Sequence, residues 1–567
     1  MAHRPIVDNS VNGVRSKQNL SCNWTGSADF GRIIPIHWEE LVAGDHVITC
    51  KPRIEMQLLP LASPTFGKID LYCHYFVVPI RQLWDKFYDV WSRTGVNQIA
   101  TFPHFTPKSL AQIYQTSTTD AQKRAMFKHW TSLGLNPFFT LTYSGITDTL
   151  TPISWFPFAA YNKIWWDFYR DPELVSDASI SSYCFTGDIN GTMPSQTSFA
   201  INYMYPRVRS IKNCWISDLF ARQGDFGDSA VFGQYDPLHY NDVNESPVTY
   251  SDSDFGTQLL DEDSGTTEPD FATARMQRLI ESLTRLSERL SLSGKRQIEQ
   301  LFARYGVKPN WAKMNLARYV GGAKSVVVVD NIISNADTAS DTGGSPLGAK
   351  AGTGYCAMND LNIEVSVDEP SILMGVVSVM PHVHFVQGLS KKWQRKYLTD
   401  MFQDSLQYVG QVAVAKREVA KKYDSVISYD QSKDGETFAF CDPYYEYKMG
   451  LDILAGDFMK YHNTSTTSLD PVAANDIHYM QSMEQYVDFP LNRQFTLNNM
   501  LVDGDPFNKI FSYLGGSVFE DVDDHFHLCI DKEVVIDRPM DGFAVPTLET
   551  TSDPHKVKQQ LSQDKML

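Results

Sequence analysis

The chain has 567 residues, of which 43% are hydrophobic and 12% aromatic, and its formal net charge is −17. This length exceeds the roughly 100 to 200 residues of one domain, so the chain holds several domains or one core with large insertions. The apolar content excludes a largely disordered protein. The negative charge excludes nucleic-acid binding over the whole surface, because such binding depends on neutralising phosphates.

Cysteine usage and the amino terminus bear on the compartment. No C-x-x-C occurs, so neither a zinc site nor a disulfide framework is predicted, as is typical of a reducing cytoplasm. The first ten residues lack the apolar centre of a signal peptide, and no apolar run approaches the about 18 residues of a membrane span. We therefore predict a soluble protein without membrane insertion. The eight cysteines are Cys22, Cys50, Cys73, Cys184, Cys214, Cys356, Cys441 and Cys529.

Residues 1–51 are rich in turn-forming residues and carry Arg4, Arg15 and Lys17 ahead of the first acidic cluster. This pattern predicts an amino-terminal arm, which either frays or lies against a partner. The next segment, from Lys68 to Val78, alternates so that its odd-numbered residues share one face. A strand is predicted there.

Two aromatic segments follow with helical spacing. The first runs from Leu83 to Trp91 and the second from Phe158 to Phe168, and each presents a broad apolar face. Basic residues between the aromatics would allow stacking on nucleic-acid bases. Because the periodicity already accounts for the aromatics, we favour packing in the core or between subunits.

Residues 223–274 contain no Lys or Arg, while acidic residues accumulate among Ser, Thr, Gly and Pro. Such a segment is expected to be an exposed loop. Its Asp-x-Asp pairs, Asp252 with Asp254 and Asp261 with Asp263, leave calcium binding open, although no EF-hand loop is present. From Met276 to Leu290 the apolar spacing predicts an amphipathic helix with a charged outer face.

The stretch from Ser293 to Asn331 reads as a helix end and a corner. Gly306 occupies the position of a left-handed helix cap, and Pro309 prevents the helix from continuing, so the helix is expected to end near Tyr305. Gly321 and Gly322 predict a sharp bend before a Val-rich strand at 326–329 that is buried on both faces.

Further strands are predicted at 361–367, 372–386 and 525–536, with a helix-rich stretch at 391–422 between the last two. Many strands far apart in the sequence, without internal repeats, predict a mainly β fold. A barrel or sandwich with long helical and loop insertions is expected.

The motifs of common enzymes are missing: there is no P-loop, dinucleotide-binding glycine pattern, nucleophile elbow or zinc-protease helix. The pairs His382 with His384 and His525 with His527 have the spacing with which metal-binding jelly rolls of the cupin class present imidazoles. The carboxylate that usually completes such sites does not follow at the expected distance. We favour histidines that pack or bond across a contact.

Several segments, in order along the chain, give the sequence a family resemblance. Together they resemble the major capsid protein of the microviruses, the small icosahedral bacteriophages with single-stranded DNA. The segments are NLSCN (19–23), GRIIPI (31–36), EELVAGD (39–45), HYFVVPIRQLWDKFYDVWSRTG (74–95), PFAAYNKIWWDFYRDPEL (157–174), IEQLFARYGV (298–307), SPLGAKAGTG (345–354) and DRPMDGFAVP (537–546).

The resemblance implies a fold and a function. It implies an eight-stranded antiparallel jelly roll that assembles, through pentamers, into a T=1 icosahedral shell around circular single-stranded DNA, with no catalytic site and no cofactor. The expected organisation is an arm at 1–51 and one jelly-roll domain at 52–567. That domain would carry insertions at 81–222 (helical and aromatic), 223–274 (acidic surface loop), 275–306 (amphipathic helix) and 390–422 (helical).

The resemblance also implies partners. These are other copies of the chain, the packaged DNA, a small basic DNA-binding protein, a DNA pilot protein, an internal scaffolding protein and a host receptor. The expected location is the virion, after assembly in the bacterial cytoplasm. Arg4, Arg15 and Lys17 are the candidates for DNA-facing residues, and Gly321→Val is expected to prevent particle formation.

Two alternatives stay open at this point. One is a cupin-like metalloenzyme that uses His382 and His384 or His525 and His527. The other is a receptor- or carbohydrate-binding β-sandwich module. Metal content and oligomer size distinguish both from a shell protein.

Overall fold

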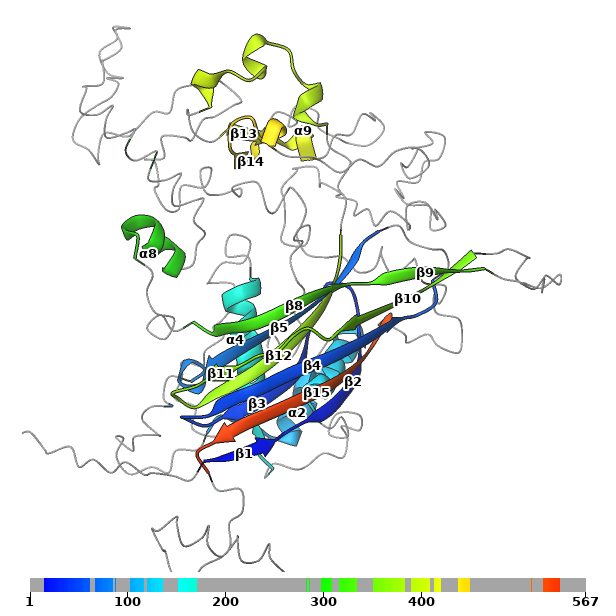
Figure 1. Cartoon of the computed structure of the whole chain (residues 1–567), viewed down its shortest axis with the longest axis vertical. Helices are drawn as coiled ribbons and strands as arrows, with labels where there is room; N and C mark the ends of the chain where they lie inside the picture. The colour runs from blue at the N-terminus through cyan, green and yellow to red at the C-terminus, as the bar shows by residue number, and fades with distance from the viewer. Residues whose placement is uncertain are drawn as a thin grey trace, which may run out of the picture.

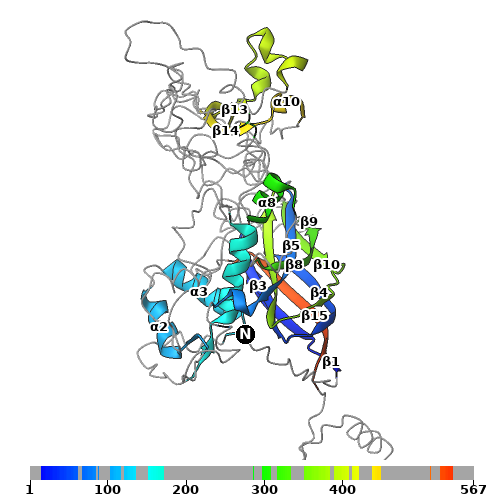
Figure 2. The same cartoon turned by 90° about the vertical axis from the view of Figure 1, so that its left-hand side faces the viewer.

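The computed structural model describes part of the chain. It covers residues 15–61, 67–84, 87, 102–116, 120–135, 151–170, 282, 285, 297–307, 316–333, 350–382, 389–407, 412–419, 437–448, 511 and 524–540. Two antiparallel sheets packed face to face form its centre (Figures 1 and 2).

The first sheet joins the two ends of the described chain. Its path runs β1–β15–β4–β10–β9, with β2 also paired to β15 and β11 also paired to β4. The long strands β4 and β15 pair from Phe526 opposite Leu58 to Asp537 opposite His46. The strands are β1 (Ser16–Asn19), β2 (Cys22–Ala28), β4 (His46–Leu58), β9 (Val328–Ile333), β10 (Lys350–Met358), β11 (Val365–Ser366) and β15 (Phe526–Arg538).

The second sheet has four strands in the order β3–β12–β5–β8. These are β3 (Ile33–Leu41), β5 (Ile69–Pro79), β8 (Arg318–Val326) and β12 (Ser371–Pro381). Strands that follow one another in sequence mostly lie in opposite sheets, because β2 and β4 belong to the first sheet while β3 and β5 belong to the second. The mainly β, two-layer architecture expected from the sequence is confirmed.

Residues 16–51 differ from the separate arm expected there. The strands β1, β2 and β3 and the start of β4 fall in this range and pair with β12 and β15. Of the DNA-facing candidates, Arg4 lies outside the described residues. The described part of the predicted arm is therefore built into both sheets.

The alternation predicted for residues 68–78 appears in β5. Its odd-numbered residues from Ile69 to Val77 are buried between the two sheets. Phe76 and Val78, on the opposite face, join a second apolar cluster together with Ile372, Met374 and Val376 of β12. The second sheet is therefore buried on both faces, which explains why all eleven residues of β12 are buried.

Helices cover the outer face of the second sheet (Figure 2). Their apolar residues, including the aromatics of the predicted helix at 158–168, form the second cluster. Core packing, the interpretation preferred from the sequence, is confirmed for that segment. The covering elements are η1 (Ile80–Gln82), α2 (Pro107–Thr116), α3 (Asp120–Ser132), α4 (Phe156–Ile164) and the π-helical turn η4 (Trp165–Tyr169), with a short ladder of β6 (His104–Phe105) and β7 (Ile153–Ser154).

Two tryptophans of the strands form hydrogen bonds with the end of α3 in the helical layer. Trp24 Nε1 donates to the Ser132 carbonyl at 3.1 Å, and Trp38 Nε1 donates to the Leu133 carbonyl at 2.8 Å. Carbonyls at a helix end lack partners within the helix, so the indoles satisfy them. Gly134, with φ of +85°, turns the chain away at this point.

The remaining described elements are short. Where the structure describes the predicted helix-rich stretch at 391–422, at residues 391–407 and 412–419, it shows three 3₁₀ turns, one strand and a single α-helical turn, so this described part is only partly helical. The elements are α8 (Gln297–Tyr305), η8 (Lys391–Trp393), η9 (Leu398–Asp400), η10 (Asp404–Leu406), β13 (Val412–Ala415), α9 (Lys416–Val419), β14 (Thr437–Cys441) and α10 (Tyr445–Lys448). The acidic segment at 223–274 lies outside the described residues.

Candidate functional site

Gly306 ends α8 in the way the sequence predicts. It has φ of +68°, and its N–H donates to the Phe302 carbonyl at 2.8 Å. A left-handed residue at this position costs glycine little, since it has no Cβ. Pro309 lies outside the described residues.

Gly321 and Gly322 do not form the predicted corner. Both lie inside β8, opposite Tyr75 and His74 of β5, and neither has a positive φ. The irregularity falls beside them instead, where the register passes from Gly321 opposite Tyr75 to Tyr319 opposite Phe76 and leaves Val320 as an extra residue. The corner was predicted from glycine's freedom to bend, whereas here the lack of a Cβ at Gly322 leaves room for the His74 and Tyr319 side chains.

The strand after these glycines also differs from the prediction. Val327 is buried, but Val326 and Val328 on either side of it are exposed. The chain passes from the second sheet to the first at this point, because β8 pairs with β5 and β9 pairs with β10. The valine run is thus buried on one face only.

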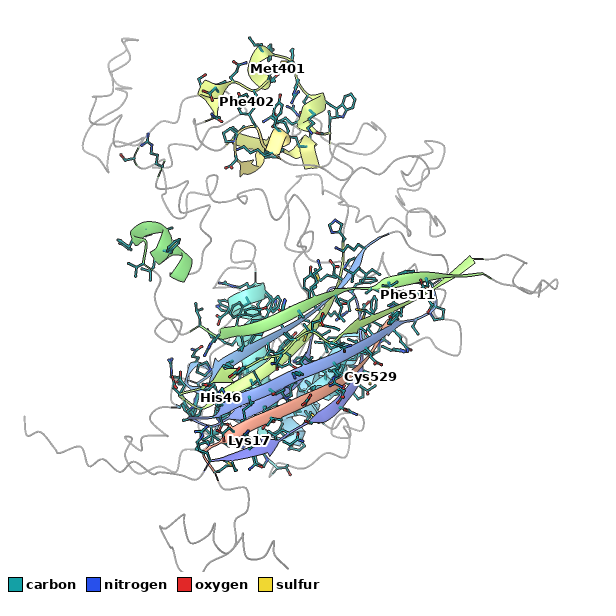
Figure 3. All side chains as sticks on the ribbon, viewed as in Figure 1. Lys17, His46, Met401, Phe402, Phe511 and Cys529 are labelled. Carbon is teal, nitrogen blue, oxygen red and sulfur yellow. The ribbon has the colours of Figure 1, made fainter. Side chains whose placement is uncertain are left out.

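Arg15 is tied to the carboxyl-terminal strand. Its Nε donates to Asp537 Oδ2 at 2.9 Å, and its Nη2 donates to the carbonyls of Gly44 and Asp537 at 2.9 and 3.0 Å. Its guanidinium therefore already has a carboxylate partner. Lys17, by contrast, is exposed on β1, and no carboxylate of the described residues lies within ion-pair distance of it (Figure 3).

A charged cluster at this end of the sandwich holds β15 to the β3–β4 turn. Arg538 Nη2 donates to Glu39 Oε1 at 2.9 Å, and its Nε lies 3.3 Å from Asp45 Oδ2. Burial raises the pKa of both the Glu39 and Asp45 carboxyls, although the nearby Arg538 opposes that rise. The cluster fixes strand ends and leaves no open site.

The histidine pairs do not form a metal site in the described residues. His525 is buried, stacks on Phe511 with ring centroids 4.5 Å apart, and has Nδ1 3.9 Å from Asp29 Oδ1. His527 is exposed on β15, so the two do not share a face. His382 donates its N–H to the Lys68 carbonyl at 2.8 Å, and His384 lies outside the described residues.

A wider search of the same part of the chain reaches the same result. Within the described residues, no three His, Cys, Asp or Glu side chains are grouped so that they would hold a metal ion. Among the helices described here, none has the length and apolar character needed to cross a membrane.

One surface was not singled out from the sequence. Exposed apolar side chains gather between residues 393 and 406. Met401 and Phe402 of this segment are labelled in Figure 3. The exposed fractions are 83% for Trp393, 64% for Tyr397, 75% for Leu398, 51% for Met401 and 50% for Phe402. The available signal was the sequence KKWQRKYLTDMF, in which a basic run leads into apolar residues without the regular spacing of a buried helix.

Comparisons with known proteins agree on one family. Residues 9–511 match the family described as Capsid protein (F protein). The capsid protein VP1 of Bdellovibrio phage phiMH2K is 22% identical over 489 residues, covering 79% of this chain and 83% of that protein. The capsid protein VP1 of Chlamydia phage 1 is 22% identical over 573 residues, covering 86% of this chain and 90% of that protein.

Proposed function

We propose, from the premise that this chain belongs to the phage capsid protein (F protein) family and is the major capsid protein of a microvirus, that it builds a T=1 shell of about sixty copies around circular single-stranded DNA. Members of this family are structural proteins of the virion, not enzymes. Pentamers are the proposed intermediates, and the bacterial cytoplasm is the proposed place of assembly.

The proposal includes an eight-stranded jelly roll. The strands β1 and β2 lie end to end along β15, and the N–H of Leu20 between them bonds the Val534 carbonyl at 2.8 Å. Likewise β10 and β11 lie along β4, and Ile363 between them exchanges backbone bonds with Cys50. Counting each pair as one interrupted strand gives a first sheet of five and a second sheet of four. Because β9 follows β8 directly in the chain, counting these two as one strand that passes from the second sheet to the first gives eight strands.

The observation that carries the assembly proposal is the exposed apolar surface at residues 398–406. Leu398, Met401 and Phe402 are each at least half exposed in the single chain (Figure 3). Side chains of this kind are costly to leave in water, and permanent subunit interfaces bury them. We infer that a neighbouring subunit covers Leu398, Met401 and Phe402.

Further partners belong to the same proposal. A charge of −17 on each chain opposes uniform contact with DNA, so a small basic packaged protein and counterions would neutralise most phosphates. A DNA pilot protein, an internal scaffolding protein and a host receptor complete the expected set. The DNA-facing role of Arg4, Arg15 and Lys17 stays a prediction.

The test is assembly of the full chain expressed with its viral partners, followed by negative-stain electron microscopy and light scattering. Uniform closed particles are expected for the natural chain. Met401→Glu with Phe402→Glu is expected to abolish them while circular dichroism stays unchanged, and Tyr355→Glu serves as an exposed control on β10. Shells at full yield from the double variant would contradict the contact, and discrete small oligomers from the natural chain would contradict the shell.

A further inference from the structure

Four cations gather within six residues at the start of the segment that carries the exposed apolar side chains of residues 393–406. Lys391, Lys392, Arg395 and Lys396 fall in the run KKWQRK, in a chain whose net charge is −17. Among the described residues, none of the four lies within 4.0 Å of a carboxylate oxygen. A local positive surface of this kind attracts anions.

Many cations elsewhere in the described residues are neutralised by a carboxylate, although Lys17 is not. The carboxylate partner lies on another element or in the same helix turn. Examples are Arg15 with Asp537, Arg81 with Glu369, Lys128 with Asp524, Lys163 with Asp167, Lys324 with Asp70 and Arg538 with Glu39. The unpaired run at 391–396 is therefore not a general property of the surface.

Aromatic rings alternate with these cations. Lys391 Nζ lies 5.3 Å from the Tyr445 ring centroid, Arg395 Cζ 4.6 Å from that of Tyr447, and Lys396 Nζ 5.1 Å from that of Tyr397. Trp393 stands between them and is 83% exposed. A tryptophan this exposed presents a ring face on which a flat ligand can stack.

The segment is held in one conformation by its own polar groups. The N–H groups of Lys396 and Tyr397 both donate to Asp400 Oδ2 at 2.7 Å, and these two bonds lower the pKa of the Asp400 carboxyl. Gln394 Nε2 donates to the Leu389 carbonyl at 2.6 Å, and the Lys392 N–H donates to Ser390 Oγ at 3.4 Å. The cations and rings are thus presented on an ordered loop.

We propose that Lys391, Lys392, Trp393, Arg395, Lys396 and Tyr397 form a binding surface for single-stranded DNA, in which phosphates meet the cations and bases stack on Trp393 and Tyr397. Unpaired cations combined with exposed rings suit a single strand, because its bases are free to stack, whereas those of a duplex are not. The inference deepens the proposed function by naming residues that contact the genome, and it rests on that function. The neighbouring residues 398–406 keep their proposed role as a subunit contact.

The test uses the purified, unassembled full chain and a fluorescent oligothymidylate of about 20 nucleotides, with anisotropy measured at several salt concentrations. The charge variant is Lys391→Gln with Lys392→Gln, matched by Arg53→Gln with Lys68→Gln on the sheets. The ring variants are Trp393→Ala and Tyr397→Ala, matched by Tyr355→Ala, another exposed tyrosine. A duplex of equal length is the second probe.

The charge variant is expected to weaken binding and to reduce the slope of log affinity against log salt by about 1.4, since each contact to a single strand contributes about 0.7. Trp393→Ala is expected to weaken single-strand binding about tenfold and duplex binding much less. The matched variants should behave as the natural chain. Unchanged oligothymidylate affinity in both the charge variant and Trp393→Ala would overturn the assignment.

Assembly of the same variants, followed by the ratio of absorbance at 260 and 280 nm in the particles, separates this inference from the proposed function. Particles at normal yield with reduced DNA binding support both. Lost particles with unchanged DNA affinity would make 391–397 a subunit contact and overturn the DNA surface alone. If the natural chain forms shells but does not bind oligothymidylate, the surface is wrong and the shell stands. If the natural chain binds oligothymidylate but forms no shells, the DNA-binding surface stands and the proposed shell is wrong.

Discussion

Lys532 on β15 and Ile36 on β3 are joined across the interior of the sandwich. Lys532 Nζ donates to the Ile36 carbonyl at 3.0 Å, and the lysine is buried. The other buried residues in its row of β15, from Phe526 to Ile536, are apolar, so this ammonium is the one charge among them. Burial lowers the pKa of Lys532. The positive charge of Lys532 shifts the pKa of titratable groups close to it.

His37 is the group on which that effect is measurable. Burial, followed by the charge of Lys532, lowers its pKa from 6.5 to about 3. Lys532→Met keeps the length of the side chain but removes the charge, so we expect the pKa of His37 to rise while staying below 6.5. Histidine-labelled NMR titration of the unassembled chain measures it. Lys324→Met, an exposed site on β8, is the control, and an unmoved His37 pKa in the Lys532 variant would contradict the coupling.

The same histidine predicts a loss of stability in acid. The unfolded chain binds a proton at His37 near pH 6.5, but the folded chain does so only near pH 3. The stabilisation is thus fully present above pH 6.5 and is lost as the pH falls from 6.5 towards 3, by about 1.4 kcal/mol per pH unit. At pH 4.5 this amounts to about 2–3 kcal/mol. Urea unfolding of the unassembled chain at pH 7 and 4.5 gives the value.

The carboxyl groups of Glu39 and Asp45 change the free energy of unfolding in the opposite direction over part of that pH range. The raised pKa values of Glu39 and Asp45 mean that the folded chain holds their protons longer as the pH rises, so their contribution favours the folded chain at low pH. Comparison with His37→Gln removes this background. We expect the Gln variant to lose less stability between pH 7 and 4.5 than the natural chain. An equal loss in both would exclude His37 as the source.

A buried ion pair positions the start of β8. Lys163 Nζ lies 3.0 Å from Asp167 Oδ1 within the helical layer, and Asp167 Oδ2 accepts the Ala317 N–H at 2.8 Å. Asp167→Ala leaves the Lys163 ammonium buried without its carboxylate and frees the Ala317 N–H, so we expect a loss of about 3–5 kcal/mol in unfolding free energy. Urea denaturation measures it. Adding Lys163→Met should recover part of the loss, and no recovery would mean that Asp167 acts mainly through Ala317.

Some of this architecture was readable from the sequence, because it depends on local periodicity. The alternation of Ile69 to Val77 fixed β5 and its two faces, and Gly306 fixed the end of α8. The aromatic spacing around Tyr161 indicated a helix in the core. Each of these signals lies within about ten residues of chain.

What escaped prediction depends on residues that meet from distant parts of the chain. Arg15 looked available for DNA because its partner, Asp537, lies 522 residues away. Residues 16–51 looked like an arm because their pairing strands, β12 and β15, come hundreds of residues later. The basic run at 391–396 was visible, but its lack of carboxylate partners became evident only in three dimensions.

Gly321 and Gly322 provide a matched pair for the last prediction, and the steric limit lies at Gly322, not at Gly321. A Cβ at Gly322 would lie 2.5 Å from His74 Cδ2, 2.6 Å from Tyr319 Oη and 2.7 Å from the Cys73 carbonyl oxygen, whereas a Cβ at Gly321 would meet only Ile363 Cγ1, at 3.6 Å. We expect Gly322→Ala to cost about 1–3 kcal/mol and to reduce particle yield, because the Cys73 backbone must shift. Gly321→Ala should be neutral or stabilising by up to about 1 kcal/mol, because alanine loses less backbone entropy in a strand. Urea unfolding of the unassembled chain, with sedimentation of co-expressed particles, tests the pair. Equal effects of the two substitutions would show that contact across β5 and β8 does not explain why glycine stands at Gly322.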